Sequence, residues 1–175
     1  RSAAPILSLT VSTLALAALD GCSNLQGGHS LGKPRAYNLK VVPGESLRQS
    51  SATVDVVGIN PSELEKWRNY SLRDYFRPGD PLRTDAMKAT VNFVPGRQEP
   101  LLLKTTDPIW NKWLRAGVQY VVVVADLPGV FPEGKAGSQD PRRQLVPLGK
   151  RCWNTTDLEV KVQAGGVTVM TTPRE

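Results

Sequence analysis

The chain has 175 residues, of which 22 are Lys or Arg and 16 are Asp or Glu, so its formal net charge is +6. Its 15 Gly and 14 Pro indicate many turns and argue against a bundle of long helices. One His and two Cys are too few for a structural zinc site or a disulfide framework, and a catalytic triad would depend on His29 alone.

The basic residues are scattered along the chain. There is no run of five or more like charges and no aromatic-interleaved basic motif of the kind that binds RNA. We interpret the excess charge as a solvated basic surface, with attraction to an anionic membrane or an acidic partner as the functional alternative. Nucleic-acid binding is a weak third alternative, and we predict no nucleic-acid partner.

The first 21 residues resemble a lipoprotein signal peptide. Segment 5–19 is uncharged, but it is short and rich in Ser and Thr for a transmembrane helix, which needs about 20 apolar residues. It fits the apolar core of a signal peptide better. The next residues, Leu19-Asp20-Gly21-Cys22, resemble the bacterial lipobox, in which Leu stands three residues before Cys and a small residue directly before it. We therefore expect Cys22 to carry the lipid, because its thiolate is the group that takes the diacylglycerol.

An ordinary signal peptide cut near Ala17-Ala18 is the alternative, and it would leave Cys22 as a plain thiol. An oxidising compartment would then permit a disulfide between Cys22 and Cys152. If Cys22 is acylated, we expect Cys152 to be a small buried hydrophobe. Segment 22–36 contains turn formers and no hydrophobic period, which predicts a flexible tether before a folded domain at 37–175.

Alternation of apolar and polar residues predicts strands with one buried and one wet face in the folded domain. The pattern occurs in four segments: 37–42, 53–59, 88–93 and 158–163. In the second of these, Val54 and Val56 are expected to be buried and Asp55 to face water. Segment 118–125 is apolar at nearly every position, which predicts a central strand covered on both faces. Shorter candidates are 101–103, 144–146 and 167–171, the last joined to the strand before it by a hairpin at Gly165-Gly166.

Two short helices are predicted between the strands. Asn60-Pro61-Ser62-Glu63 supplies an N-cap residue, a proline at the first helical position and an acid at the third. A helix is therefore expected to begin there, with Leu64 and Trp67 on its apolar face. The second helix is expected to begin at Asp107-Pro108 and to end before Gly117.

The second helix places Trp110 and Trp113 on one apolar face. Core packing is the expected role of these rings. The alternative is a platform on which sugar rings stack, which would require both rings to be exposed and coplanar. A lipoprotein module that binds envelope glycan through Trp110 and Trp113 is therefore the competing functional hypothesis.

These elements predict a mainly β protein, an antiparallel two-sheet β-sandwich with two short helices. Segment 127–141 is expected to be a long surface loop and a candidate recognition site. No P-loop, Gly-x-Ser-x-Gly, Gly-x-Gly-x-x-Gly or His-Glu-x-x-His pattern occurs. We therefore predict a binding or scaffolding protein with no cofactor and no metal, and only a carboxylate pair clustered in a cleft would favour a hydrolase.

The order of these features resembles the TssJ family, the outer-membrane lipoproteins of the type VI secretion system. The features are a lipobox, a tether, two strands, an aromatic helical segment at 67–76, a Val-rich strand ending in Val-Val-Ala-Asp at 123–126, and a closing hairpin. The resemblance implies a transthyretin-like sandwich of two sheets, no catalysis and a lipid anchor at the periplasmic face of the outer membrane. It also implies docking to the periplasmic part of the inner-membrane protein TssM.

In that family the loop between the first two strands contributes to the partner contact. The matching stretch here is 43–51. The resemblance implies that Leu47 is the apolar anchor of this contact and that Glu45 and Arg48 are its flanking charges. The function that it implies is tethering or scaffolding of a type VI secretion membrane complex.

Overall fold

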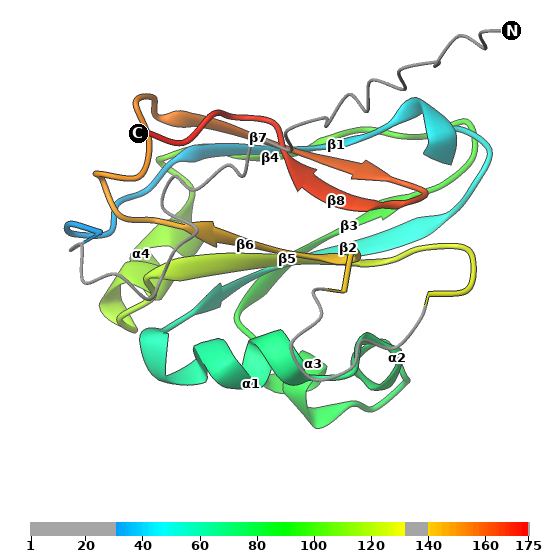
Figure 1. Ribbon diagram of the computed structural model, residues 1–175, viewed down its shortest axis with the longest axis horizontal. Coiled ribbons are helices and arrows are strands. Elements are labelled where there is room, and N and C mark those ends of the chain that lie inside the picture. Colours follow the sequence, from blue (N-terminus) through cyan, green and yellow to red (C-terminus); the bar gives the residue numbers. More distant parts are fainter. Residues whose placement is uncertain (1–30, 132–139, 175) are drawn as a thin grey trace, which may run out of the picture.

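The computed structural model describes residues 31–131 and 140–174, which form two β-sheets packed face to face and a layer of short helices (Figure 1). The predicted leader, Cys22 and the first part of the predicted tether lie outside the described residues. The middle of the predicted 127–141 loop lies outside them as well.

Within the described residues, each sheet has four strands, and all eight predicted strands form close to their predicted bounds. One sheet has the order β4-β1-β7-β8 and contains β1 (Asn38–Pro43), β4 (Leu101–Leu103), β7 (Asp157–Gln163) and β8 (Gly166–Val169). The other has the order β3-β2-β5-β6 and contains β2 (Ala52–Ile59), β3 (Lys88–Phe93), β5 (Tyr120–Asp126) and β6 (Arg143–Pro147). The predicted hairpin joins β7 to β8.

The two-sheet sandwich is confirmed, but its strands are not all antiparallel. β1 and β7 pair in parallel, with Leu39 opposite Leu158 and Val41 opposite Val160. The residues before β1 are hydrogen-bonded to the residues before β7, so both strands enter the sheet from the same end. Hydrophobic alternation reports which face of a strand is buried but carries no information about strand direction. The sequence therefore could not reveal this pairing.

The main core lies between the two sheets and is built from the inward-facing residues of both. Val54 and Val56 of β2 are fully buried there, as predicted, together with the aromatic rings of Tyr37 and Phe93. Cys152 is also buried in this core, as expected of a small hydrophobe. Burial of apolar surface between two sheets is the main stabilising contribution to such a sandwich.

A second hydrophobic cluster lies on the other face of the β3-β2-β5-β6 sheet, where a helical layer covers it (Figure 1). Residues between β2 and β3 form this layer: η2 (Pro61–Glu63), α1 (Leu64–Asn69), α2 (Leu72–Tyr75) and α3 (Pro81–Asp85). The predicted helix start is confirmed, because the Asn60 side chain accepts from the Ser62 amide and the Glu63 carboxylate accepts from the Asn60 amide. The helical cover explains why β5 is apolar on both faces, as predicted.

The number of helices differs from the prediction of two. Among the described residues there are four α-helices, the fourth being α4 (Pro108–Arg115) at one end of the sandwich, and two 3-10 turns. α3 was not predicted, although Asp80-Pro81 supplies a cap and a first-turn proline, and the Asp80 carboxylate accepts from the Arg83 amide at 2.8 Å. With only five residues, this helix has no hydrophobic period long enough to read from the sequence.

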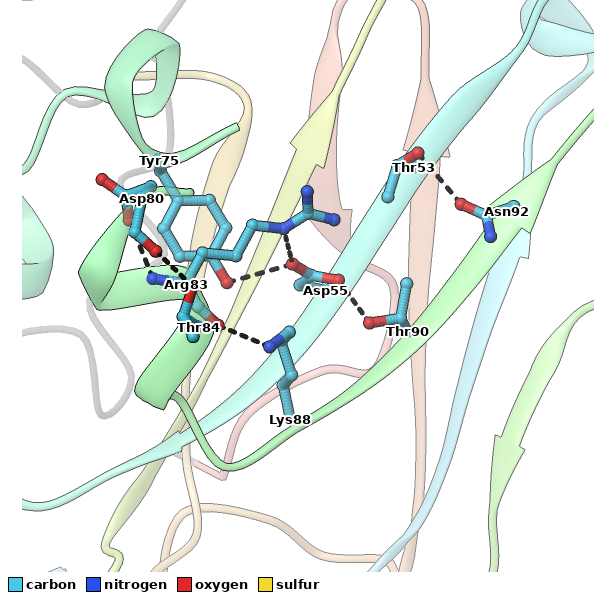
Figure 2. Close-up of polar contacts among 9 residues, drawn as sticks. All are labelled: Thr53, Asp55, Tyr75, Asp80, Arg83, Thr84, Lys88, Thr90 and Asn92. Atoms are coloured by element: carbon cyan, nitrogen blue, oxygen red, sulfur yellow. Dashed lines mark hydrogen bonds and ion pairs between the residues drawn. The ribbon is translucent and has the colours of Figure 1, made fainter. Parts of the chain in front are cut away.

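Asp55 joins the helical layer to the sheet (Figure 2). The prediction that it faces water is wrong, because its side chain is fully buried between β2 and the helices. One carboxylate oxygen accepts from Arg83 Nε at 2.8 Å and Tyr75 Oη at 3.0 Å. The other oxygen accepts from Thr90 Oγ1 at 2.6 Å, on the neighbouring strand β3. These three donors compensate for the water that the carboxylate loses on burial.

Replacing Asp55 should therefore loosen the helical layer. We expect Asp55→Asn to lower the free energy of unfolding by about 3 kcal/mol, because it removes the charge that Arg83 faces. Tyr75→Phe, which removes one donor, should cost about 1 kcal/mol. Urea denaturation followed by circular dichroism measures both. Asp85 on α3 is exposed, so Asp85→Asn is the matched control. Its free energy of unfolding should stay within about 0.5 kcal/mol of that of the parent. Equal stability of Asp55→Asn and the parent would contradict this role.

Candidate partner-binding surface

The loop between β1 and β2 is held against the β7-β8 hairpin, at the end of the sandwich where β1 ends (Figure 1). It contains one 3-10 turn, η1 (Glu45–Leu47). The Gly44 amide donates to the Val162 carbonyl at 2.7 Å, and the Ala164 amide donates to Ser46 Oγ at 2.9 Å. A Cβ atom on Gly44 would lie 2.7 Å from Cγ of Gln163, so the close approach of the loop to the hairpin favours glycine here. The loop therefore has a defined conformation on the sandwich.

Leu47 does not lie on the surface of this loop. Its side chain is 0% exposed and belongs to the core between the sheets. Its backbone carbonyl accepts a hydrogen bond from the Gln98 side chain, which ties the loop to the residues between β3 and β4. The prediction that Leu47 is the apolar anchor of a partner contact is therefore corrected: the turn of η1 directs this side chain inward, where it supports the loop.

Glu45 and Arg48, the other two predicted contact residues, are exposed on η1 and the residue after it. Their side chains are 75% and 67% exposed and form an ion pair of 2.6 Å between Oε2 and Nη2. An exposed pair of this kind contributes little to stability, so its charges are available to a partner at small cost. Ser46, Gln49 and Ser51 are exposed beside them, so the loop presents a polar surface without an apolar anchor.

Trp110 and Trp113 are buried, with 1% and 0% of their surfaces exposed. Their rings are perpendicular rather than coplanar, at an interplanar angle of 87° and a centroid distance of 5.0 Å. Trp113 Nε1 donates to the Met87 carbonyl at 2.9 Å, and its ring lies directly over Gly58 of β2, where a Cβ atom would be 2.5 Å away. The expected core role is confirmed. The glycan platform is excluded, because neither ring can be reached by a sugar.

The buried ionisable side chains form closed contacts within the protein. Burial, and then the charge of Asp55, raise the pKa of Tyr75 far above its usual value, so Tyr75 stays a neutral donor. The hydrogen bond to Asp55 raises the pKa of Arg83. Burial alone would raise the pKa of Asp140, but hydrogen bonds from Arg142 outweigh it and the pKa is lowered. The carboxylates of Asp55 and Asp140 therefore accept hydrogen bonds from donors of the protein itself.

The surface of the described residues is hollowed in at least two places. A hollow of about 570 Å³ lies on the outer face of the β4-β1-β7-β8 sheet, and another of about 470 Å³ lies between α2 and residues 126–131. Across residues 31–131 and 140–174, no three His, Cys, Asp or Glu side chains are grouped so that they could hold a metal ion. In the same residues, no helix has the length and apolar character needed to cross a membrane.

The arrangement of sheets and helices resembles that of a solved structure. Lip of Serratia marcescens, described as a membrane-bound component of the type VI secretion system, superposes with a TM-score of 0.51 over 79% of this chain and 97% of its own. The chain shares the fold of Lip. The two sequences are only 12% identical, so the similarity concerns the fold.

Two further solved structures are similar at lower scores. One is described as a type VI membrane complex, with 14% identity, a TM-score of 0.49 and coverage of 78% of this chain and 98% of that chain. The other is the type VI secretion lipoprotein TssJ1 from Pseudomonas aeruginosa, with 11% identity, a TM-score of 0.42 and coverage of 81% and 99%. No protein-family model and no curated protein matches the chain.

Burial of the tryptophans leads to a simple spectroscopic expectation. All four Trp rings are at most 3% exposed, so acrylamide should quench the native fluorescence weakly and the unfolded protein strongly. Added glycan strands should leave the emission maximum unchanged. The control is Met87→Trp, which introduces a ring at an exposed position and should restore strong quenching. Strong quenching of the parent protein, or a shift with glycan, would contradict the burial of Trp110 and Trp113.

Proposed function

We propose that this protein is a lipid-anchored periplasmic lipoprotein that tethers or scaffolds a type VI secretion membrane complex at the outer membrane. It acts without catalysis, by binding the periplasmic part of a TssM-like inner-membrane protein. The single observation that supports this most strongly is the shared fold with the S. marcescens lipoprotein over 97% of that chain. The lipobox at Leu19–Cys22 supports it independently, because it predicts the anchor from the sequence alone.

The shape of the sandwich suits a tether. The described chain begins at the end of the sandwich where β1 starts, and η1 lies at the opposite end, where β1 finishes (Figure 1). A lipid on Cys22 would hold the first end near the membrane. The loop at 44–51 would then point away from the membrane, toward a partner that crosses the periplasm. We therefore propose that the exposed Glu45 and Arg48 take part in the partner contact.

The anchor is tested by cell fractionation of a Cys22→Ser variant in which an ordinary cleavable signal peptide replaces residues 1–21, so that the leader is removed from the variant. We expect the parent to sediment with outer membranes and the variant to move to the soluble periplasmic fraction, because serine cannot take the diacylglycerol. Cys152→Ser is the control for the other cysteine and should stay with the membrane. Unchanged membrane retention of the Cys22→Ser variant would remove the anchoring proposal.

The partner contact is tested by capture of a TssM-like periplasmic domain. We expect Arg48→Glu to weaken capture by about tenfold or more, because a central Arg in an interface commonly contributes more than 1 kcal/mol. Binding is measured by surface plasmon resonance with the unlipidated chain. Leu47→Asp is unsuitable for this purpose, because it places a charge in the core and should unfold the protein.

Two variants make this capture experiment specific. The exchange Glu45→Arg with Arg48→Glu keeps the exposed ion pair and reverses its direction, so it should also weaken capture without loss of stability. Lys66→Glu, an exposed change of the same charge on α1, is the matched control and should bind like the parent. Parent-like affinity of both loop variants would exclude this loop from the contact.

A further inference from the structure

Five basic residues gather at the end of the sandwich where the described chain begins. They belong to three segments, 31–36, 148–156 and 170–174, which contain no Asp or Glu. We call this surface the cationic end and define it by its members Lys33, Arg35, Lys150, Arg151 and Arg174. The three segments are far apart in the sequence, so only the fold brings their charges together.

Backbone hydrogen bonds hold the three segments side by side. The Lys150 amide donates to the Lys33 carbonyl at 3.1 Å, and the Arg151 amide donates to the Leu31 carbonyl at 3.2 Å. The Arg174 amide donates to the Cys152 carbonyl at 2.8 Å. A Cβ atom on Gly149 would lie 2.1 Å from the Leu31 carbonyl oxygen, so a residue with a side chain does not fit there. The end of the predicted tether is therefore part of the folded domain.

The charges of this end are not neutralised within the described protein. Lys33, Lys150 and Arg151 are exposed, and no carboxylate of the described residues forms an ion pair with them. Elsewhere, six basic residues are paired with carboxylates: Lys40, Arg48, Arg68, Arg77, Arg83 and Arg142. Within the described residues, this end therefore carries a positive charge that no ion pair with a carboxylate compensates.

Two arginines of this end are bound to neutral groups, which leaves their charge in place. The Arg35 guanidinium lies 4.8 Å from the centroid of the Tyr37 ring and donates to the Thr155 carbonyl at 3.1 Å. Arg174 Nε donates to Asn154 Oδ1 at 2.5 Å. These contacts orient the side chains without cancelling their charge, so they add a fixed positive potential to that of the lysines.

The length of the chain relates this surface to the membrane. Cys22 lies nine residues before Leu31, and an extended chain spans at most about 3.6 Å per residue, so these residues reach at most about 32 Å. Leu31 enters the fold within the cationic end itself. A lipid on Cys22 would therefore hold this end, rather than the η1 end, next to the headgroups.

We infer that the cationic end docks on the anionic phospholipid headgroups of the membrane in which the lipid is inserted. This inference rests on the proposed lipid anchor, since the anchor supplies the proximity. Basic residues close to a membrane surface are attracted by its negative potential, and the attraction falls within a Debye length. Docking would orient the sandwich and direct the loop at 44–51 away from the membrane.

The test uses the mature chain, residues 22–175, carrying Cys22→Ser, so that neither the predicted leader nor a lipid contributes to binding. Flotation is measured with vesicles of phosphatidylethanolamine and phosphatidylglycerol and with vesicles of phosphatidylcholine alone. We expect flotation only with the anionic vesicles, and we expect salt to reverse it. A triple variant should bind the anionic vesicles on the order of a hundredfold more weakly, because each charge near the membrane surface strengthens binding about fivefold. The variant carries Lys33→Gln, Lys150→Gln and Arg151→Gln.

A triple control variant separates this surface from net charge. Lys66→Gln, Arg77→Gln and Arg97→Gln also remove three exposed charges, but from other parts of the surface, and should float like the parent. Thermal unfolding followed by circular dichroism checks that both triple variants are folded.

Three results would overturn the inference: no flotation of the parent, equal loss in both triple variants, or binding to polyaspartate but not to vesicles. The last would assign the cationic end to an acidic protein. Because the assay contains neither lipid anchor nor partner, its failure leaves the fractionation and capture results unaffected.

Discussion

The carboxylate of Asp55 is the point at which the helical layer is joined to the sheet beneath it. It lies in the middle of β2, the strand that pairs with both β3 and β5, and it accepts hydrogen bonds from α2, α3 and β3. A charge buried at this depth is stable only if all of its partners are in place. The helical segment between β2 and β3 is therefore fixed in one position on the sheet. In this position Trp67 and Tyr75 cover the outer face of β5.

Both faces of the β3-β2-β5-β6 sheet are covered, so the two ends of the sandwich differ from its middle in what they expose. One face of the β3-β2-β5-β6 sheet is covered by helices and the other by the second sheet. The parallel pairing of β1 with β7 brings the first described residues, the 148–156 segment and the C-terminal residues to one end. The β1-β2 loop lies at the other end. The two ends of the molecule therefore differ, which suits the tethering function proposed above.

Burial separated the predicted contact residues into two groups. The family resemblance implied a surface role for Leu47, yet its side chain lies in the core. Trp110 and Trp113 also lie in the core, which was their expected role, and the alternative of an exposed platform is ruled out. Glu45 and Arg48 are exposed, and charged residues are expected there because burying them without a partner is costly. Asp55 was missed as a buried residue, although a signal existed. Val57 and Ile59 lie on the same face of β2 as Asp55, and their apolar side chains indicate that this face is buried. A carboxylate on a buried face needs hydrogen-bond donors within the protein.

The amino-acid sequence by itself determined the eight strands, the start of the first helix and the burial of β5, because hydrophobic periodicity and capping residues are local properties. It could not determine the parallel β1-β7 pair, the inward position of Leu47 or the partners of Asp55. Those depend on contacts between residues that are tens of positions apart. The cationic end is of the same kind: its charges stand in three distant segments of the sequence, and only the tertiary structure decided that they share one surface on which no carboxylate of the described residues pairs with the exposed Lys33, Lys150 and Arg151.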